Sequence, residues 1–285
     1  MDVVTAARAR DPHRAGTRCG TAYSCPVLIL LPPSEGKFAP TRGKSLDLAT
    51  LSHPSLTTAR SQVLEALVDL CRADTEKAAA TLGLGPKQLD LVARNAGLLE
   101  APTARADAIY TGVLYDALDF ETLSSAAKRR ATTRIGIASA LFGLLSPADR
   151  IPAYRLSGDA TLPGVGGLGG VWRPVLGEAV AEVNGDGLLV DLRSGMYANL
   201  WRPGPEAAPQ VAGVRVLHEH NGQRKVVSHF NKATKGRIVR ALMEDGGAPR
   251  TPAELANALR DLGWTVETGK VTKKGTELDV VVSEV

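Results

Sequence analysis

The sequence predicts a mixed α/β fold, of the α+β kind, in a single compact domain. The chain has 285 residues, of which 44% are hydrophobic, enough for one sizeable core. Residues 27–31 and 188–192 form short apolar runs that are typical of buried strands, and residues 54–72 carry an amphipathic helical pattern. Strands and helices are therefore mixed, without the regular alternation of a doubly wound fold.

The domain is expected to begin at residue 27, after a flexible N-terminal extension (1–26). The extension contains arginines but no apolar stretch behind them, so it does not resemble a secretory signal peptide. Residues 27–31 contain no polar side chain and precede two prolines, which favours a central strand that ends there. In residues 54–72, apolar side chains recur at i, i+3 and i+4, which predicts a helix with one buried face. Further helices are predicted at 75–81 and 88–95.

The carboxyl-terminal half contains a predicted hairpin. Asn221-Gly222 strongly favours a two-residue type I′ turn, here between strands at 214–220 and 223–230. A helix is expected at about 232–243. Residues 251–254, Thr-Pro-Ala-Glu, combine a capping box with proline at the first helical position, so they begin the last helix. Short strands near 265–268 and 278–282 close the chain.

Composition excludes several classes of protein. No apolar run approaches the roughly 18 to 20 residues that span a bilayer, so we expect no membrane segment. Cys19, Cys25 and Cys71 form neither a CxxC pair nor an even set, which argues against a disulfide framework and a zinc site and favours a reducing cytoplasm. The net charge of +4 says little about nucleic acid, but basic residues cluster at 128–134 and 224–240. A solvated surface is the alternative explanation for both clusters.

Residues 82–87, Leu-Gly-Leu-Gly-Pro-Lys, lie between two predicted helices and have the pattern of a helix-hairpin-helix DNA-binding element. Two glycines allow positive φ and a close approach of the backbone to a ligand. We expect the amides of Gly85, Lys87 and Gln88 to open the second helix without intrahelical partners, where a phosphate would be favoured. The alternative is an ordinary glycine C-cap followed by proline, which is common between helices.

Three other patterns resemble cofactor or metal sites, but none of them predicts one, so we expect no cofactor and no metal. Residues 164–169 satisfy G-x-G-x-x-G, but no buried strand precedes them, which argues against dinucleotide binding. Residues 32–37 end in Gly-Lys but lack the first glycine and the Ser or Thr of a P-loop. His218 and His220 share a strand face, yet Lys225 would lie opposite and repel a cation.

Several short motifs follow one another in a fixed order. They are Pro-Pro-Ser-Glu-Gly-Lys (32–37), Tyr-Thr-Gly (110–112), Leu-Phe-Gly-Leu-Leu (141–145) with Pro147, Tyr-Arg-Leu (154–156), Trp172, Arg-Ser-Gly-Met-Tyr (193–197), Ser-His-Phe-Asn-Lys (228–232) and Lys-Gly (235–236). From about residue 27 to the C-terminus, their order and spacing resemble the YaaA peroxide-stress proteins of bacteria. The first motif looks like the actinobacterial branch, because other members have Ser-Pro-Ala-Lys there. Lys37 thus matches the lysine of the family motif, whereas the resemblance implies no role for Ser34 or Glu35.

The resemblance implies a cytoplasmic protein that protects cells from hydrogen peroxide, limits iron-driven damage and binds DNA, favouring distorted duplexes. It also implies a single compact α/β domain with a helix-hairpin-helix element beside a positively charged cleft. Residues 75–95 fall where that element is expected. We therefore expect DNA, bound without sequence specificity, as the partner of a monomer that needs no cofactor.

Two hypotheses from different classes follow. In the first, the corner and a basic cleft grip backbone phosphates, and kinked DNA costs less to bend into place. Its residues are Gly83, Gly85, Lys87, Gln88, Arg155, Lys232, Lys235 and Arg237. In the second, polar and aromatic residues at strand ends and loops form an enzyme or small-ligand pocket with a lysine as base or nucleophile. Its candidates are Lys37, Tyr110, Thr111, Tyr154, Arg155, Ser194, Tyr197 and Lys232, and the alternative for the tyrosines is a core position with a satisfied hydroxyl.

Overall fold

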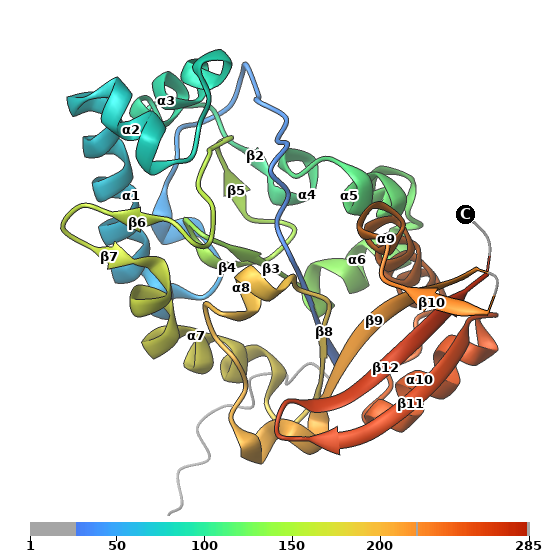
Figure 1. Cartoon of the computed structure of the whole chain (residues 1–285). Coiled ribbons are helices and arrows are strands. Elements are labelled where there is room, and N and C mark those ends of the chain that lie inside the picture. Colours follow the sequence, from blue (N-terminus) through green and yellow to red (C-terminus); the bar gives the residue numbers. More distant parts are fainter. Residues whose placement is uncertain (1–26, 221, 284–285) are drawn as a thin grey trace, which may run out of the picture.

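A central, mostly parallel sheet organises the molecule (Figure 1). The computed structural model describes residues 27–220 and 222–283. The strands lie in the order β11-β12-β9-β8-β1-β3-β4, and β10 pairs with the end of β9. Neighbours from β12 to β3 run parallel, whereas β4, β10 and β11 are antiparallel to their partners. The strands are β1 (Val27–Leu31), β3 (Ile135–Ser139), β4 (Gly143–Leu145), β8 (Leu188–Asp191), β9 (Val211–His220), β10 (Gln223–Lys225), β11 (Thr265–Thr272) and β12 (Gly275–Val282).

Helices cover the middle of this sheet on both faces. All five residues of β1 are buried, as expected for a parallel strand without polar side chains. Helices α6 and α9 contact each other and pack on β1 and β9, whereas α7 packs on β1 and β4 together with α1. The long helices are α1 (Thr57–Ala73), α6 (Ser125–Arg134), α7 (Leu168–Asn184), α9 (Ser228–Asp245) and α10 (Pro252–Asp261); the short ones are α2 (Thr75–Thr81), α3 (Leu89–Ala96), α4 (Ala106–Ile109), α5 (Val113–Leu118) and α8 (Gly195–Ala198).

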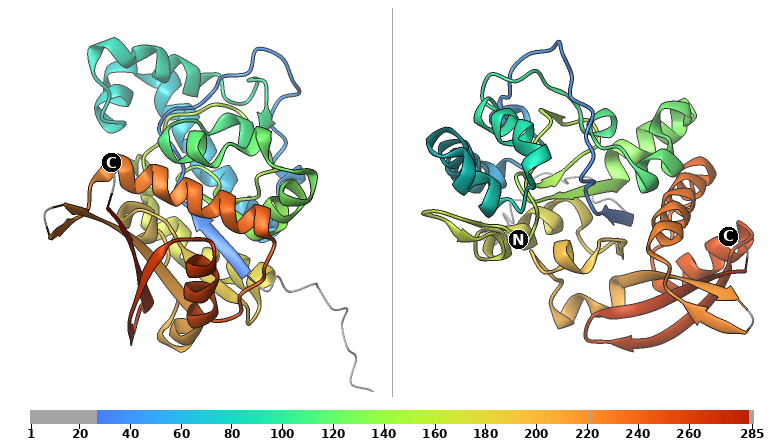
Figure 2. Two further views of the ribbon diagram at one scale, coloured as in Figure 1. Left: turned by 90° about the vertical axis from the view of Figure 1, so that its right-hand side faces the viewer. Right: turned by 45° about the horizontal axis from the view of Figure 1, so that its top comes forward.

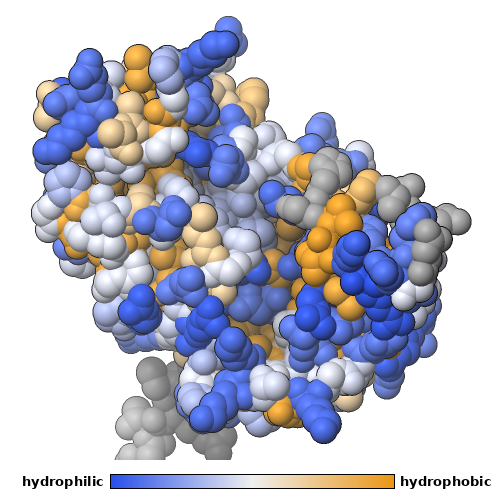
Figure 3. Space-filling model, viewed as in Figure 1, coloured by the Kyte–Doolittle hydropathy of each residue, from blue (hydrophilic) through white to orange (hydrophobic). Residues whose placement is uncertain are grey.

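Strand β1 lies at a switch in the direction of chain winding. From β1 the chain passes to β3 on one side and returns to β8 on the other side. In open sheets of this kind, the crevice at the carboxyl ends of such strands is the usual ligand site. Figure 2 shows α1–α3 on one side of the segment that leaves β1 and α9 on the other. The surface between these two sides is hollowed in the space-filling view (Figure 3).

The predicted hairpin is confirmed in register but not in length. Gln223 pairs with His220 and Lys225 with His218, yet β10 ends at Lys225 and α9 begins at Ser228. The prediction of a strand as far as residue 230 was wrong because the packing of α9 overrides the local pattern. Gly236 is required for that packing, since a Cβ there would overlap the carbonyl oxygen of Leu114 on α5.

The other predicted elements are confirmed within a few residues, and the last two strands are longer than expected. Residues 164–169 follow only the two-residue strand β6 (Thr161–Leu162), and they span a turn, β7 (Gly166–Gly167) and the first turn of α7 rather than a loop after a central strand. Within the described ranges, no helix is both long and apolar enough to cross a bilayer. The remaining short elements are β2 (Ala104–Arg105), β5 (Arg150–Ile151) and the 3₁₀ turns at Leu48–Thr50, Pro54–Leu56, Pro86–Gln88, Phe120–Thr122 and Pro205–Gln210.

Candidate functional site

A pocket of about 390 Å³ opens at the carboxyl ends of β1 and β8. This volume is within the range of small-molecule sites. Six of the eight candidate residues of the second hypothesis meet there, although they come from five separate motifs. Of these, Lys37, Thr111, Arg155, Ser194, Tyr197 and Lys232 line the pocket, together with Ser34 and Glu35.

The loop that follows β1 is fixed by hydrogen bonds to the segment before α5. Ser34 Oγ accepts a hydrogen bond from the Thr111 amide (3.2 Å) and donates one to the Gly36 carbonyl (2.6 Å). The Phe38 amide donates to the Ile109 carbonyl (2.8 Å). Ser34 therefore has a positioning role in this chain, which the motif resemblance did not provide.

Lys37 is held between backbone carbonyls and two aromatic rings. Its Nζ donates to the Ser34 carbonyl (2.7 Å) and lies 4.3 Å from the ring centroid of Tyr154 and 5.5 Å from that of Tyr110. Burial lowers the pKa of Lys37 to about 7, and the positive charge of Arg155 adds to this effect. A substantial fraction of the amine is therefore neutral at neutral pH.

The hydroxyls of Tyr110 and Tyr154, whose rings contact Lys37, belong to a buried chain of hydrogen bonds. The Tyr154 hydroxyl is 2.9 Å from that of Tyr110 and 2.8 Å from Ser139 Oγ, which accepts a hydrogen bond from the Phe142 amide (2.9 Å). Burial raises the pKa of both tyrosines, so both stay neutral. Their hydroxyls are satisfied core groups, as the alternative explanation held, and only their ring faces support the site.

Arg155 also lines the pocket, and α3 holds its backbone in place. The buried side chain of Asn95 donates to the Arg155 carbonyl (2.7 Å) and accepts from the Arg155 amide (2.9 Å). The guanidinium forms an ion pair with Glu35 (3.0 Å), whose carboxylate is mostly exposed. Among the described residues, its buried Nε has no hydrogen-bond acceptor. Helix α3, the second helix of the predicted DNA-binding element, thus holds the backbone that carries Arg155, although none of its own residues lines the pocket.

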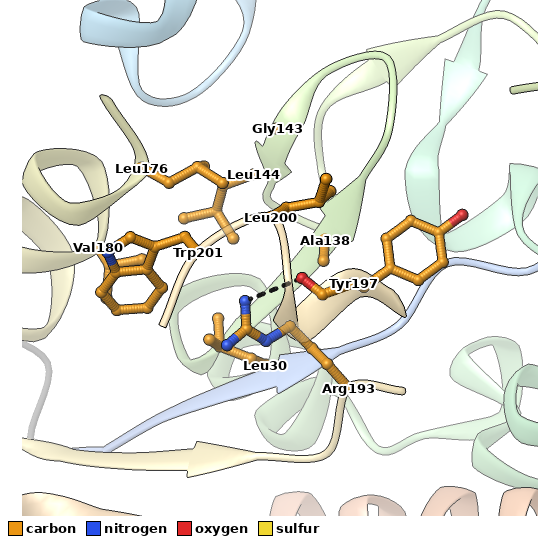
Figure 4. Close-up of a pocket in the computed structure, with 10 residues that line it drawn as sticks. All are labelled: Leu30, Ala138, Gly143, Leu144, Leu176, Val180, Arg193, Tyr197, Leu200 and Trp201. Atoms are coloured by element: carbon orange, nitrogen blue, oxygen red, sulfur yellow. Dashed lines mark hydrogen bonds between the residues drawn. The ribbon is translucent and has the colours of Figure 1, made fainter. Parts of the chain in front are cut away.

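The turn after β8 carries Ser194 and Tyr197, and an ion pair fixes it. Arg193 Nε and Nη2 donate to the two oxygens of Asp191 (2.9 and 2.8 Å), and Nη1 donates to the Tyr197 carbonyl (3.4 Å). Below this turn lies a second cavity of about 10 Å³, too small for a ligand (Figure 4). Burial raises the pKa of Tyr197 to about 12. Asp191 is the one acidic residue in the apolar run 188–192, and this pattern is the feature of the sequence from which the ion pair with Arg193 could have been predicted.

Helix α9 also contributes to the lining of the pocket. Lys232 is exposed and lines the pocket, and Lys235 donates from Nζ to the Leu192 carbonyl (3.2 Å). Burial lowers the pKa of Lys235, and Asp191 opposes that effect. Arg237 lies two residues beyond Lys235, or about 200° around the helix, so it faces away from this group.

The corner between α2 and α3 is at the surface, with Gly83 exposed at φ 63°. Two of its three key amides are already paired. The Gly85 amide donates to Gln88 Oε1 (3.1 Å), and the Gln88 amide donates to the Gly85 carbonyl (2.9 Å). The expectation that these two amides lack partners was therefore wrong, because the Gln88 side chain accepts from the Gly85 amide and the 3₁₀ turn pairs the Gln88 amide with the Gly85 carbonyl. Lys87 remains exposed beside it.

Comparison with known proteins places the chain among peroxide-stress proteins. The model of a family described as "Peroxide stress protein YaaA" matches residues 27–269. The chain belongs to the YaaA family. A UPF0246 protein of Streptomyces coelicolor is 53% identical over 91% of this chain and 100% of its own length. UPF0246 proteins of Corynebacterium efficiens (40% identical; 89% of this chain, 100% of the relative) and Corynebacterium glutamicum (42%; 85% and 95%) cover most of this YaaA-family chain as well.

Proposed function

We propose that this YaaA-family protein acts in peroxide stress by binding the phosphate backbone of DNA across the pocket, as a cytoplasmic monomer. One observation supports this most strongly: Arg155, whose backbone is held by α3, and Lys232 of α9 line one pocket together with Lys37. Asn95 ties α3 to Arg155, and Lys232 lines the pocket from α9. The charged residues that line it are Lys37, Arg155 and Lys232 against Glu35.

In this proposal, side-chain cations carry the contact rather than the corner amides. Gly85 and Gln88 would have to give up their mutual hydrogen bonds to bind a phosphate. Lys87, Lys232 and Arg155 require no such rearrangement of the backbone. Phosphate contacts of this kind hold the duplex without reading bases, and a distorted duplex enters a hollow at lower bending cost.

The link to iron-driven damage is proposed to be indirect, through protection of DNA. Within the described residues, no group of three or more His, Cys, Asp or Glu side chains is arranged to hold a metal ion. Cys71, the cysteine within the described residues, is buried, and burial raises the pKa of its thiol. A thiol in that state is a poor reductant of peroxide.

A titration of purified protein with straight, bulged and junction duplexes at two salt concentrations tests the proposal. We expect tighter binding of the distorted duplexes. Lys232→Gln should lower the slope of log K against log salt by about 0.9, the effect of one lost phosphate contact. Lys273→Gln, at the exposed turn after β11, is the matched control and should leave the slope unchanged. Affinity that is indifferent to salt and to duplex shape would contradict the proposal.

A second function, enzymatic catalysis in the pocket, is favoured by the convergence of the motif residues around a largely buried lysine. DNA binding alone does not require an amine with its pKa near neutrality. Such an amine serves as a base or a nucleophile.

A further inference from the structure

Lys37 differs from the other lysines that the proposals use because its amine is enclosed. Its Nζ donates to the Ser34 carbonyl (2.7 Å) and to the Glu35 carbonyl (3.5 Å). A neutral amine has two N–H bonds and one lone pair. Both of these carbonyls are acceptors, so they engage the two hydrogens and leave the lone pair available to a ligand in the pocket.

We propose that Lys37 is a catalytic nucleophile that forms a Schiff base with the aldehyde of a phosphate-bearing ligand. This inference rests on the pocket proposed above. The groups that face the amine are the rings of Tyr110 and Tyr154 and the charges of Arg155, Arg94 and Glu35. The two arginines and burial favour the neutral amine, whereas Glu35 and the faces of the two tyrosine rings favour the protonated one.

The step is balanced without any further reactant. The lone pair of Nζ attacks the aldehyde carbon, and one amine hydrogen passes as a proton to the carbonyl oxygen to give a carbinolamine. The oxygen then leaves as water with both amine hydrogens, and a C=N bond to Nζ remains. The tyrosine hydroxyls below the lysine are engaged with one another and with Ser139, so they do not compete for its lone pair.

The phosphate requirement follows from the charges that line the pocket. Arg155 and Lys232 both line it, and the buried Nε of Arg155 has no acceptor among the described residues. Glu35 offsets one of these charges. A guanidinium and an ammonium that line one pocket suit a phosphate ester. A pocket of about 390 Å³ accommodates a sugar-sized group.

Two sources supply an aldehyde close to a phosphate: a free sugar phosphate and an abasic site within DNA. The experiment incubates the full chain with borohydride and either glyceraldehyde 3-phosphate or an abasic-site duplex. Borohydride reduces a Schiff base to a stable amine, which peptide mapping locates. At pH 7 an ordinary lysine is neutral in fewer than about one molecule in a thousand, so Lys37 should be modified about tenfold or more above exposed Lys77. Unphosphorylated glyceraldehyde should modify Lys37 less.

Lys37→Arg should abolish the adduct at this position, because a guanidinium does not lose its proton, and Lys77→Arg should retain it. An adduct with one probe alone supports the nucleophile and assigns the source. The inference would be overturned if neither probe gave an adduct at Lys37, or if Lys37 and Lys77 of the unsubstituted protein were modified equally. Both results are obtained with the unsubstituted protein, so they do not depend on whether a variant folds. Binding of intact bulged duplexes, measured separately, shows whether the proposed function fails as well.

Discussion

Replacing Lys37 with methionine is expected to stabilise the fold at low pH. Methionine keeps the length of the side chain but removes the amine. Burial lowers the pKa of Lys37 from 10.5 to about 7. At about 1.36 kcal/mol per pKa unit, the protonated form costs about 5 kcal/mol in the folded state. Loss of the hydrogen bond to the Ser34 carbonyl offsets about 1 kcal/mol, and water at the pocket mouth reduces the cost further, so we expect a net gain of about 1–3 kcal/mol.

The sign of the pH dependence follows from proton binding. Between about pH 7 and pH 10.5, the unfolded chain holds a proton on Lys37 that the folded chain lacks, so the stability of the unmodified protein rises with pH. The advantage of Lys37→Met should therefore be largest near about pH 6 and shrink toward about pH 9. Urea unfolding at both pH values measures it, with Lys77→Met, at an exposed position on α2, as the control. A Lys37→Met variant that is less stable by the same amount at both pH values would refute the reasoning.

Two further substitutions test the supports of the site. Asn95→Ala leaves the amide and carbonyl of Arg155 without their partner and should cost about 2–4 kcal/mol in urea unfolding; a cost below about 0.5 kcal/mol would contradict the role given to Asn95. Tyr154→Phe removes the hydroxyl between Tyr110 and Ser139 and should cost about 1–3 kcal/mol in urea unfolding. Borohydride trapping at Lys37 should persist, because the ring beside the amine remains. Loss of trapping would show that the hydroxyl itself takes part.

Much of the fold could be predicted because local sequence and burial agree. Strand β1 has no polar position, and it lies where both faces of the sheet are covered. The Asn-Gly pattern predicted the hairpin register, since a two-residue turn would place Gln223 opposite His220, and this pairing is observed. The same local reasoning failed at Val226 and Val227, where a strand-like pattern precedes a helix whose position depends on α5.

Six residues singled out from the motifs line one pocket, but the contacts that hold them could not be predicted. Lys37, Arg155 and Lys232 all reach one pocket. Their partners are distant in sequence or depend on side-chain orientation: Asn95 pairs with a backbone 60 residues away, and Gln88 turns back on Gly85. Periodicity and motif spacing carry no information on such contacts.

The central claim is that the pocket and the helices on either side of it form one binding surface. The rate at which Lys37 is modified by an amine-directed reagent, with and without saturating bulged duplex, tests this claim most directly. Bound DNA should slow the modification of Lys37 and leave that of exposed Lys273 unchanged. A protein that binds the duplex while Lys37 reacts at its unbound rate would contradict the account.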